Sequence, residues 1–137
     1  MERRLRNAEN YWLATTRPDG RPHSMPVYGL WEEGCFWFGT GLASVKGRNI
    51  AAGSDAVVHL ESGDDVVIVE GTAEVVADGA DPNPVTPRLA AKYGMSAAEM
   101  EIDDPASGAA LYRVRPKVVL AWLEGAFPQT RSRWELS

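Results

Sequence analysis

Tight turns separate short β-prone runs in the first 40 residues of the chain. The runs occupy 11–16, 21–31 and 35–39, with Pro-Asp-Gly at 18–20 and Glu-Glu-Gly at 32–34 between them. Pro, Asp and Gly are favoured in turns because they set or tolerate the required backbone angles. Strands joined by such short connections pair antiparallel. The sequence therefore begins with a predicted three-stranded antiparallel meander.

The remaining chain alternates helical and extended patterns. A helix is predicted over 43–52, with Ser44 as its N-cap and Gly53 at its end. Two strands are expected next, over 56–61 and 65–76, and then a loop over 78–87 and short helices over 88–93 and 96–100. A last strand is expected over 110–123, before an irregular tail, 124–137, that carries Trp134. We predict a mostly β, six-stranded antiparallel barrel with short helices inserted, forming a single domain over 1–137.

Composition restricts the function classes. The 137 residues are 45% hydrophobic and 24% charged, as in a soluble globular domain. The net charge of −5 argues against nucleic-acid or anionic-membrane partners. No apolar run approaches the roughly 20 residues of a membrane span, no signal peptide is recognisable, and the single cysteine, Cys35, excludes an internal disulfide. We expect a cytoplasmic protein that binds neither nucleic acid nor membrane.

The segment 40–50 carries the strongest chemical signal. It follows a predicted buried strand, opens a helix, and contains hydroxyl donors at Thr40 and Ser44 and positive charge at Lys46 and Arg48. Helix N-termini, hydroxyls and cationic side chains suit a phosphate group. The alternative is an ordinary capped surface helix whose Lys and Arg are solvated. On spacing alone the two interpretations are equally supported.

A resemblance to a known family favours the phosphate site. Thr40, Ser44, Lys46, Arg48 and Ile50 resemble the motif of the pyridoxamine 5′-phosphate oxidase-like superfamily, which includes flavin and deazaflavin oxidoreductases. The similarity extends over nearly the whole chain, through 13–16, 18–22, 26–27, 67–74 and Arg133-Trp134. It implies an FMN-binding split β-barrel that forms a homodimer, with the cofactor in a groove between subunits.

The resemblance also assigns roles to individual residues. Thr40, Ser44 and Lys46 match positions that hold the cofactor phosphate, and Arg48 and Asn49 flank them. Trp122 and Trp134 are candidates to approach the ring from the partner subunit. The strand expected to lie along the cofactor ring consists of His23, Ser24, Met25, Pro26 and Val27.

Departures from the family pattern narrow the expected activity. Val45 stands where pyridoxamine phosphate oxidases have an arginine, and His23 and Tyr28 fall near an expected Arg and Lys. We also expect their C-terminal substrate-phosphate segment to be missing. We therefore expect an FMN- or coenzyme F420-dependent reductase, not a pyridoxamine phosphate oxidase. It would transfer a hydride between the cofactor and a small planar conjugated substrate, with Tyr28 or solvent as proton donor.

Other hypotheses remain open at this point. The chain could be a non-catalytic flavin, deazaflavin or haem carrier, or a barrel with an empty groove. His23 and His59 are the only histidines, and an isolated strand histidine is more often structural than a ligand. No residue spacing suggests a metal site. Arg17, Arg21 or Arg48 could receive the acidic tail of F420, but the sequence does not choose between F420 and FMN.

Overall fold

A computed structural model describes residues 1–77, 83–102, 104–123 and 131–136 of the chain. Within these residues, eight strands form one antiparallel sheet in the order β2-β1-β5-β6-β7-β4-β3, with β8 paired to β7. Their bounds are β1 Tyr11–Thr16, β2 Pro22–Val27, β3 Leu30–Glu32, β4 Cys35–Gly41, β5 Asp55–His59, β6 Asp65–Ala77, β7 Ala109–Leu123 and β8 Ser132–Glu135. The helices are α1 Glu2–Asn7, α2 Val45–Ala51 and α3 Val85–Lys92, with 3₁₀ turns η1 Ala98–Met100 and η2 Pro105–Ser107.

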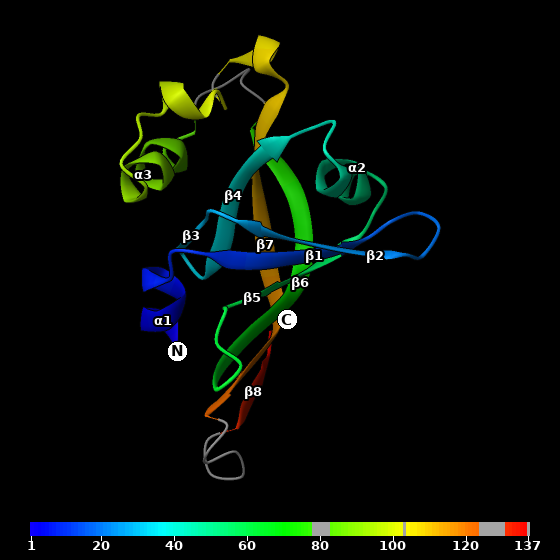
Figure 1. Cartoon of the computed structure of the whole chain (residues 1–137), viewed down its shortest axis with the longest axis vertical. Helices are drawn as coiled ribbons and strands as arrows, with labels where there is room; N and C mark the ends of the chain where they lie inside the picture. Colours follow the sequence, from blue (N-terminus) through cyan, green and yellow to red (C-terminus); the bar gives the residue numbers. More distant parts are fainter. Residues whose placement is uncertain (78–82, 103, 124–130, 137) are drawn as a thin grey trace.

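The strands at the two ends of the pairing order, β2 and β3, follow one another directly in the sequence, so the sheet has to curl to bring its ends together. Only Tyr28 and Gly29 separate them. In Figure 1, β1 and β2 cross the direction of the long strands β6 and β7. Tyr11 on β1 consequently packs against Phe36 on β4, with ring centroids 4.6 Å apart, although β5, β6 and β7 lie between β1 and β4 in the pairing order. The fold is a mostly β, antiparallel split barrel, as predicted.

The predicted number of strands was wrong. The expected strand 21–31 is divided into β2 and β3, because the chain crosses from one end of the curled sheet to the other at Tyr28-Gly29. Ser132–Glu135, expected in an irregular tail, forms β8 along β7. The helix α3 starts at Val85, inside the predicted loop, and the predicted helix 96–100 is the 3₁₀ turn η1. The residues 78–82 and 124–130 lie outside the described residues.

Two hydrophobic clusters stabilise the barrel. The first fills the interior with side chains from β1, β4, β5, β6 and β7, including Tyr11, Phe36 and Tyr112. The second lies between the outer face of β4 and β7 and the segment that carries α3, and includes Trp37 and Leu89. Burial of apolar area contributes about 25 cal/mol per Å². The interior is therefore filled by side chains, and any ligand site lies at an edge or an end of the barrel.

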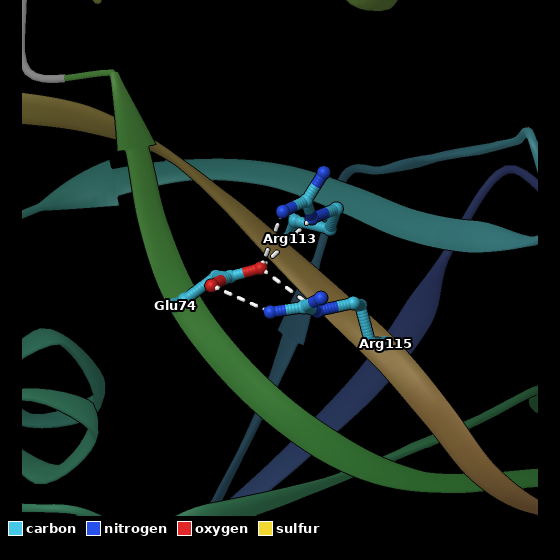
Figure 2. A network of polar contacts seen from close by, with 3 residues as sticks. All are labelled: Glu74, Arg113 and Arg115. Carbon is cyan, nitrogen blue, oxygen red and sulfur yellow. Dashed lines mark hydrogen bonds and ion pairs between the residues drawn. The ribbon is translucent and has the colours of Figure 1, made fainter. Parts of the chain in front are cut away.

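The strands β6 and β7 form the long axis of the sheet. Their register shifts between Glu70 and Gly71, where a Cβ on residue 71 would lie 2.2 Å from the carbonyl oxygen of Arg115. This bulge bends both strands. Beyond it, Figure 2 shows Glu74 held between Arg113 and Arg115, with Arg113 Nη2 2.5 Å from Glu74 Oε1. These hydrogen bonds keep the pKa of Glu74 below its ordinary value.

Candidate functional site

The helix α2 begins directly after β4 at the edge of the barrel. Ser44 is its N-cap, as predicted: its hydroxyl accepts a hydrogen bond from the Gly47 N–H at 3.0 Å and donates to the Gly41 carbonyl at 2.7 Å. Thr40 donates to the Ser44 hydroxyl at 3.3 Å. Both predicted hydroxyls are thus gathered at the start of α2. The Ser44 hydroxyl is therefore fully engaged in this network, with its proton and both lone pairs used, and its role is to hold the start of the helix.

Lys46 follows in the first turn of α2 and is half-buried. Removal from water lowers the pKa of its ammonium group. Seven arginines of the described chain form ion pairs with carboxylates, but within the same residues Lys46 forms none. A cation that is partly desolvated and lacks a carboxylate partner is electrostatically incomplete. In a chain of net charge −5 such a cation is a candidate for binding an anion.

His23 on β2 is close to this cation. Its cross-strand partner is Thr15, whose hydroxyl accepts a hydrogen bond from the Asn49 side chain, one helical turn beyond Lys46. Burial and the positive charges of Arg17 and Lys46 lower the pKa of His23, and no carboxylate is among the charges that act on it. Nδ1 of His23 is buried and finds no hydrogen-bond partner within the described residues.

Since the charges of Arg17 and Lys46 both act on His23, the three residues together are called the basic corner. The three residues come from the end of β1, from β2 and from α2. Arg17 is kept in place because its Nη1 donates to the Pro22 carbonyl at 2.8 Å. An unpaired cation, a second cation and an orphaned imidazole nitrogen fit an anionic group such as a phosphate. The cofactor phosphate implied by the family motif thus has suitable residues here.

The strand β2 lies at one end of the sheet. It pairs only with β1 among the described strands, so its other edge presents backbone groups to a ligand. The interior face of β2 carries His23, Met25 and Val27. Paired residues lie on the same face of a sheet, and their partners on β1 are the buried Thr15, Leu13 and Tyr11. Ser24 and Pro26 lie on the outer face. Met25 is 44% exposed, which leaves the rim of this face open.

The other predicted cofactor residues on α2 point in different directions. Arg48 is exposed and forms no ion pair within the described residues. Asn49 is only 2% exposed, and its amide donates to Thr15 Oγ1 at 3.0 Å. Asn49 therefore fastens α2 to β1 and does not lie with Lys46 at the basic corner.

The predicted aromatic residues are not gathered at one place. Tyr28 is 53% exposed and stacks on Tyr93 of the segment after α3, with centroids 4.1 Å apart. Trp122 is opposite Val66 on β6, whereas Trp134 is opposite Val119 on β7. Because Val66 and Val119 lie on opposite faces of the sheet, so do the two indoles. They do not form one wall within a subunit.

Two contributors to the site were not among the predicted site residues. Gly47 allows α2 to lie close to the preceding chain, because a Cβ there would be 2.5 Å from the Gly41 carbonyl oxygen. The hydroxyl of Tyr112 is buried beneath Gly47 and is without a hydrogen-bond partner in the described residues. Glycine inside a predicted helix is a signal of close packing. Nothing in the β-strand pattern around Tyr112 distinguishes it from a core residue.

Neither a metal cluster nor a membrane helix is found in the described part of the chain. No group of three or more His, Cys, Asp or Glu side chains is placed to hold a metal ion in residues 1–77, 83–102, 104–123 and 131–136. Over the same residues, none of the helices has the length and apolar character needed to span a bilayer.

The family follows from comparison with known proteins. Residues 1–123 match the family model described as pyridoxamine 5′-phosphate oxidase, so the chain belongs to this family. No curated protein matches it. A solved structure called F420 reductase has a TM-score of 0.67 and 25% identity, covering 84% of this chain and 92% of its own.

Two further structures share the fold. PhzG from Burkholderia lata, solved with tetrahydrophenazine-1-carboxylic acid, has a TM-score of 0.67 and 19% identity over 99% of this chain and 80% of its own. A heme binding protein from Mycobacterium smegmatis has a TM-score of 0.66 and 22% identity over 94% of this chain and 53% of its own. One fold thus accommodates proteins with several kinds of ligand, and function has to be argued from the site.

Proposed function

We propose that this protein is a flavin- or deazaflavin-dependent reductase that holds the phosphate of FMN or coenzyme F420 at the basic corner. The observation that carries the proposal is the half-buried Lys46, which lacks a carboxylate partner among the described residues and lies near Arg17 and His23. Membership of the pyridoxamine 5′-phosphate oxidase family and the similarity to the F420 reductase structure support it.

The protein's part in this reaction is binding and orientation. When bound, the cofactor supplies the hydride chemistry. Lys46 and Arg17 neutralise the phosphate, and the Ser44 cap keeps the start of α2 fixed beside it. The free edge of β2 offers backbone groups to the polar edge of the ring, while Met25 and Val27 shape its apolar surroundings. The shortage of acid–base residues is compatible with this division of work.

A titration with FMN and with F420 tests the proposal. We expect one of them to bind with micromolar affinity and Lys46→Ala to weaken binding at least tenfold, the magnitude of one buried charge-assisted contact. Arg48→Ala is the matched control, because Arg48 is an exposed cation of the same helix. A loss of less than threefold would be expected there. Failure of both cofactors to bind, or equal binding by the Lys46→Ala variant, would contradict the proposal.

Turnover separates a reductase from a carrier. The assay follows oxidation of reduced F420 or FMN by the wild-type protein in the presence of quinone-like, enone or tetrapyrrole acceptors. Tight binding of the cofactor without turnover on any acceptor would favour the carrier. Haem binding to the same chain, unaffected by Lys46→Ala, would favour the haem alternative, which has a fold relative in the mycobacterial heme binding protein.

We also propose that the protein is a homodimer. On the outer face, strand register aligns Pro26, Trp12, His59, Ile68 and Leu120 in one row across five strands. The row is largely apolar, and Trp12 and His59 stack with centroids 6.4 Å apart. Apolar side chains on an outer sheet face favour contact with a second copy of the chain. Trp122, which lies on this face, would then be near the partner, while Trp134 on the opposite face would be farther from it.

A further inference from the structure

A hollow that belongs neither to the basic corner nor to the proposed dimer face lies between α1, the β2–β3 junction and α3. Its volume is about 620 Å³, and it is lined by Arg6, Asn7, Glu9, Tyr28, Lys92 and Tyr93. Small-molecule sites commonly have volumes of 300–1,000 Å³. The side chains that line this hollow determine which kind of ligand it can bind.

Lys92 is fixed at the boundary of this hollow. Its Nζ donates to Tyr11 Oη at 2.7 Å and to the Gly29 carbonyl at 2.8 Å, and it lies 4.6 Å from the centroid of the Tyr11 ring. An ammonium group has three donor hydrogens, so one remains after these two bonds. Within the described residues, no carboxylate forms an ion pair with Lys92. A preorganised cation with a remaining donor therefore borders the hollow.

Two stacked tyrosines provide a flat wall. The rings of Tyr28 and Tyr93 are 4.1 Å apart and inclined by 10°. Tyr93 is held rigidly, because its hydroxyl accepts from the Gly29 N–H at 2.9 Å and lies 2.7 Å from the Glu9 carbonyl oxygen. Tyr28 is more than half exposed, so part of its ring remains available for stacking. An aromatic wall beside a cation suits a planar molecule that carries negative charge.

We propose that this hollow binds a planar organic carboxylate, which stacks on Tyr28 and accepts a hydrogen bond from Lys92. Burial lowers the pKa of Lys92 to about 8, so the side chain is cationic at neutral pH and becomes neutral at alkaline pH. Glu9 is the acidic group of the hollow, and Arg6, which forms an exposed ion pair with Glu2, is its second cation. Net attraction of a carboxylate consequently depends on Lys92 keeping its proton.

The location suggests what the ligand does. Tyr28 directly follows Val27, the last residue of β2, along which the cofactor ring is proposed to lie. The ligand would then be the hydride acceptor, held by its carboxylate at the far end from the phosphate. This role rests on the proposed function, whereas the binding site itself does not.

Binding of 2-naphthoate to the cofactor-free protein tests the site. We expect 2-naphthoate to bind at least tenfold more tightly than the neutral 2-naphthylmethanol, and to lose at least tenfold in affinity between pH 7 and pH 10. Lys92→Met should weaken 2-naphthoate binding at least tenfold and Tyr28→Ala several-fold. Arg88→Met is the matched control: it removes a cation from the same helix, but one that is paired with Glu32 at 2.7 Å.

The outcomes distinguish this site from the proposed cofactor site. Equal affinity for the two naphthalene compounds in the wild-type protein would overturn the carboxylate site without any variant having to fold. So would 2-naphthoate binding that is unchanged in a folded Lys92→Met variant, or the absence of binding at millimolar concentration. If FMN or F420 binds in a Lys46-dependent way while 2-naphthoate does not bind, only this inference fails. If 2-naphthoate binds as described and neither cofactor does, only the proposed function fails.

Discussion

Asn49 on α2 donates its side-chain amide to the hydroxyl of Thr15 on β1 at 3.0 Å, and both side chains are almost completely buried. This bond fixes the helix that carries Lys46 against the strand next to His23. Asn49→Ala leaves the Thr15 hydroxyl without this partner, which costs about 1–3 kcal/mol. We expect a lower free energy of unfolding in chemical denaturation and weaker cofactor binding, although Asn49 need not touch the cofactor.

A double-mutant cycle separates the hydrogen bond from general packing. The cycle compares Thr15→Val, Asn49→Leu and the double variant. The double variant should lose less stability than the sum of the two single losses, because it leaves no buried polar group unpaired. Strictly additive losses in the double variant would show that the two side chains are not coupled.

The sequence predicted the strands that alternate cleanly and the N-cap of α2, because these depend on local patterns. Ser44 caps the helix as its residue type and position require. The glycine turn at Gly34 likewise closes the β3–β4 hairpin, with positive φ at Glu33 and Gly34. The division of 21–31 into β2 and β3 could not be predicted in this way, since it results from the curling of the whole sheet. The strand β8 depends on pairing with distant β7.

The same distinction applies to the site. The sequence identified Lys46 and His23 from a motif, but not their mutual placement. Asn49 was assigned to the site with its neighbours, whereas the structure turns its amide inward to Thr15. Which side chains of the seven-residue helix α2 point inward depends on the face that the sheet covers. The spacing of the residues alone did not reveal that face. The hollow beside Lys92 joins parts of the chain more than 60 residues apart and left no local signal.

Gly47 should be intolerant of any side chain. A Cβ at this position would be 2.5 Å from the Gly41 carbonyl oxygen and 2.9 Å from that of Leu42. Gly47→Ala should therefore lower the free energy of unfolding by about 1–3 kcal/mol and displace α2, with loss of cofactor affinity, even though alanine has the higher helix propensity. Thermal unfolding and cofactor titration measure both effects.

Gly41→Ala is the matched control for this prediction. A Cβ at Gly41 would lie 3.9 Å from the Gly108 carbonyl oxygen, an ordinary contact. It should change stability by less than 1 kcal/mol. A Gly47→Ala variant as stable as the wild type would mean that the start of α2 can move without cost.

The outer-face row should control oligomeric state. Ile68→Lys places a charge in the middle of the proposed dimer face, opposite Leu120. We expect sedimentation velocity to show a shift from dimer to monomer, because burying an unpaired charge at an interface costs several kcal/mol. Val75→Lys is the control: it makes the same kind of change on β6 at an exposed position beyond the bulge. A monomeric wild-type protein would refute the dimer, and equal dissociation in both variants would refute this choice of face.

Cofactor affinity should increase as the pH falls, and His23 should be responsible. Its pKa is lowered by burial and by Arg17 and Lys46, so the free protein holds it neutral at pH 7. A bound phosphate screens these cations and raises the pKa of His23. Between the free and the bound pKa, binding takes up a proton, and affinity therefore rises as the pH decreases through this window. Folding stability of the cofactor-free protein responds in the opposite direction. As the pH falls, the unfolded chain protonates His23 before the folded protein does, so the free energy of unfolding decreases.

The two histidines of the chain provide the comparison. His23→Gln should remove this contribution to the pH dependence of the dissociation constant between pH 5 and 8. His59→Gln should retain it, because His59 lies on the outer face, with Nδ1 2.8 Å from the Leu60 carbonyl oxygen. Since a phosphate monoester such as that of FMN also titrates near pH 6, the difference between the two variants is the informative quantity. Identical pH profiles for wild type, His23→Gln and His59→Gln would place the phosphate beyond the reach of His23, and Lys46 would then act without it.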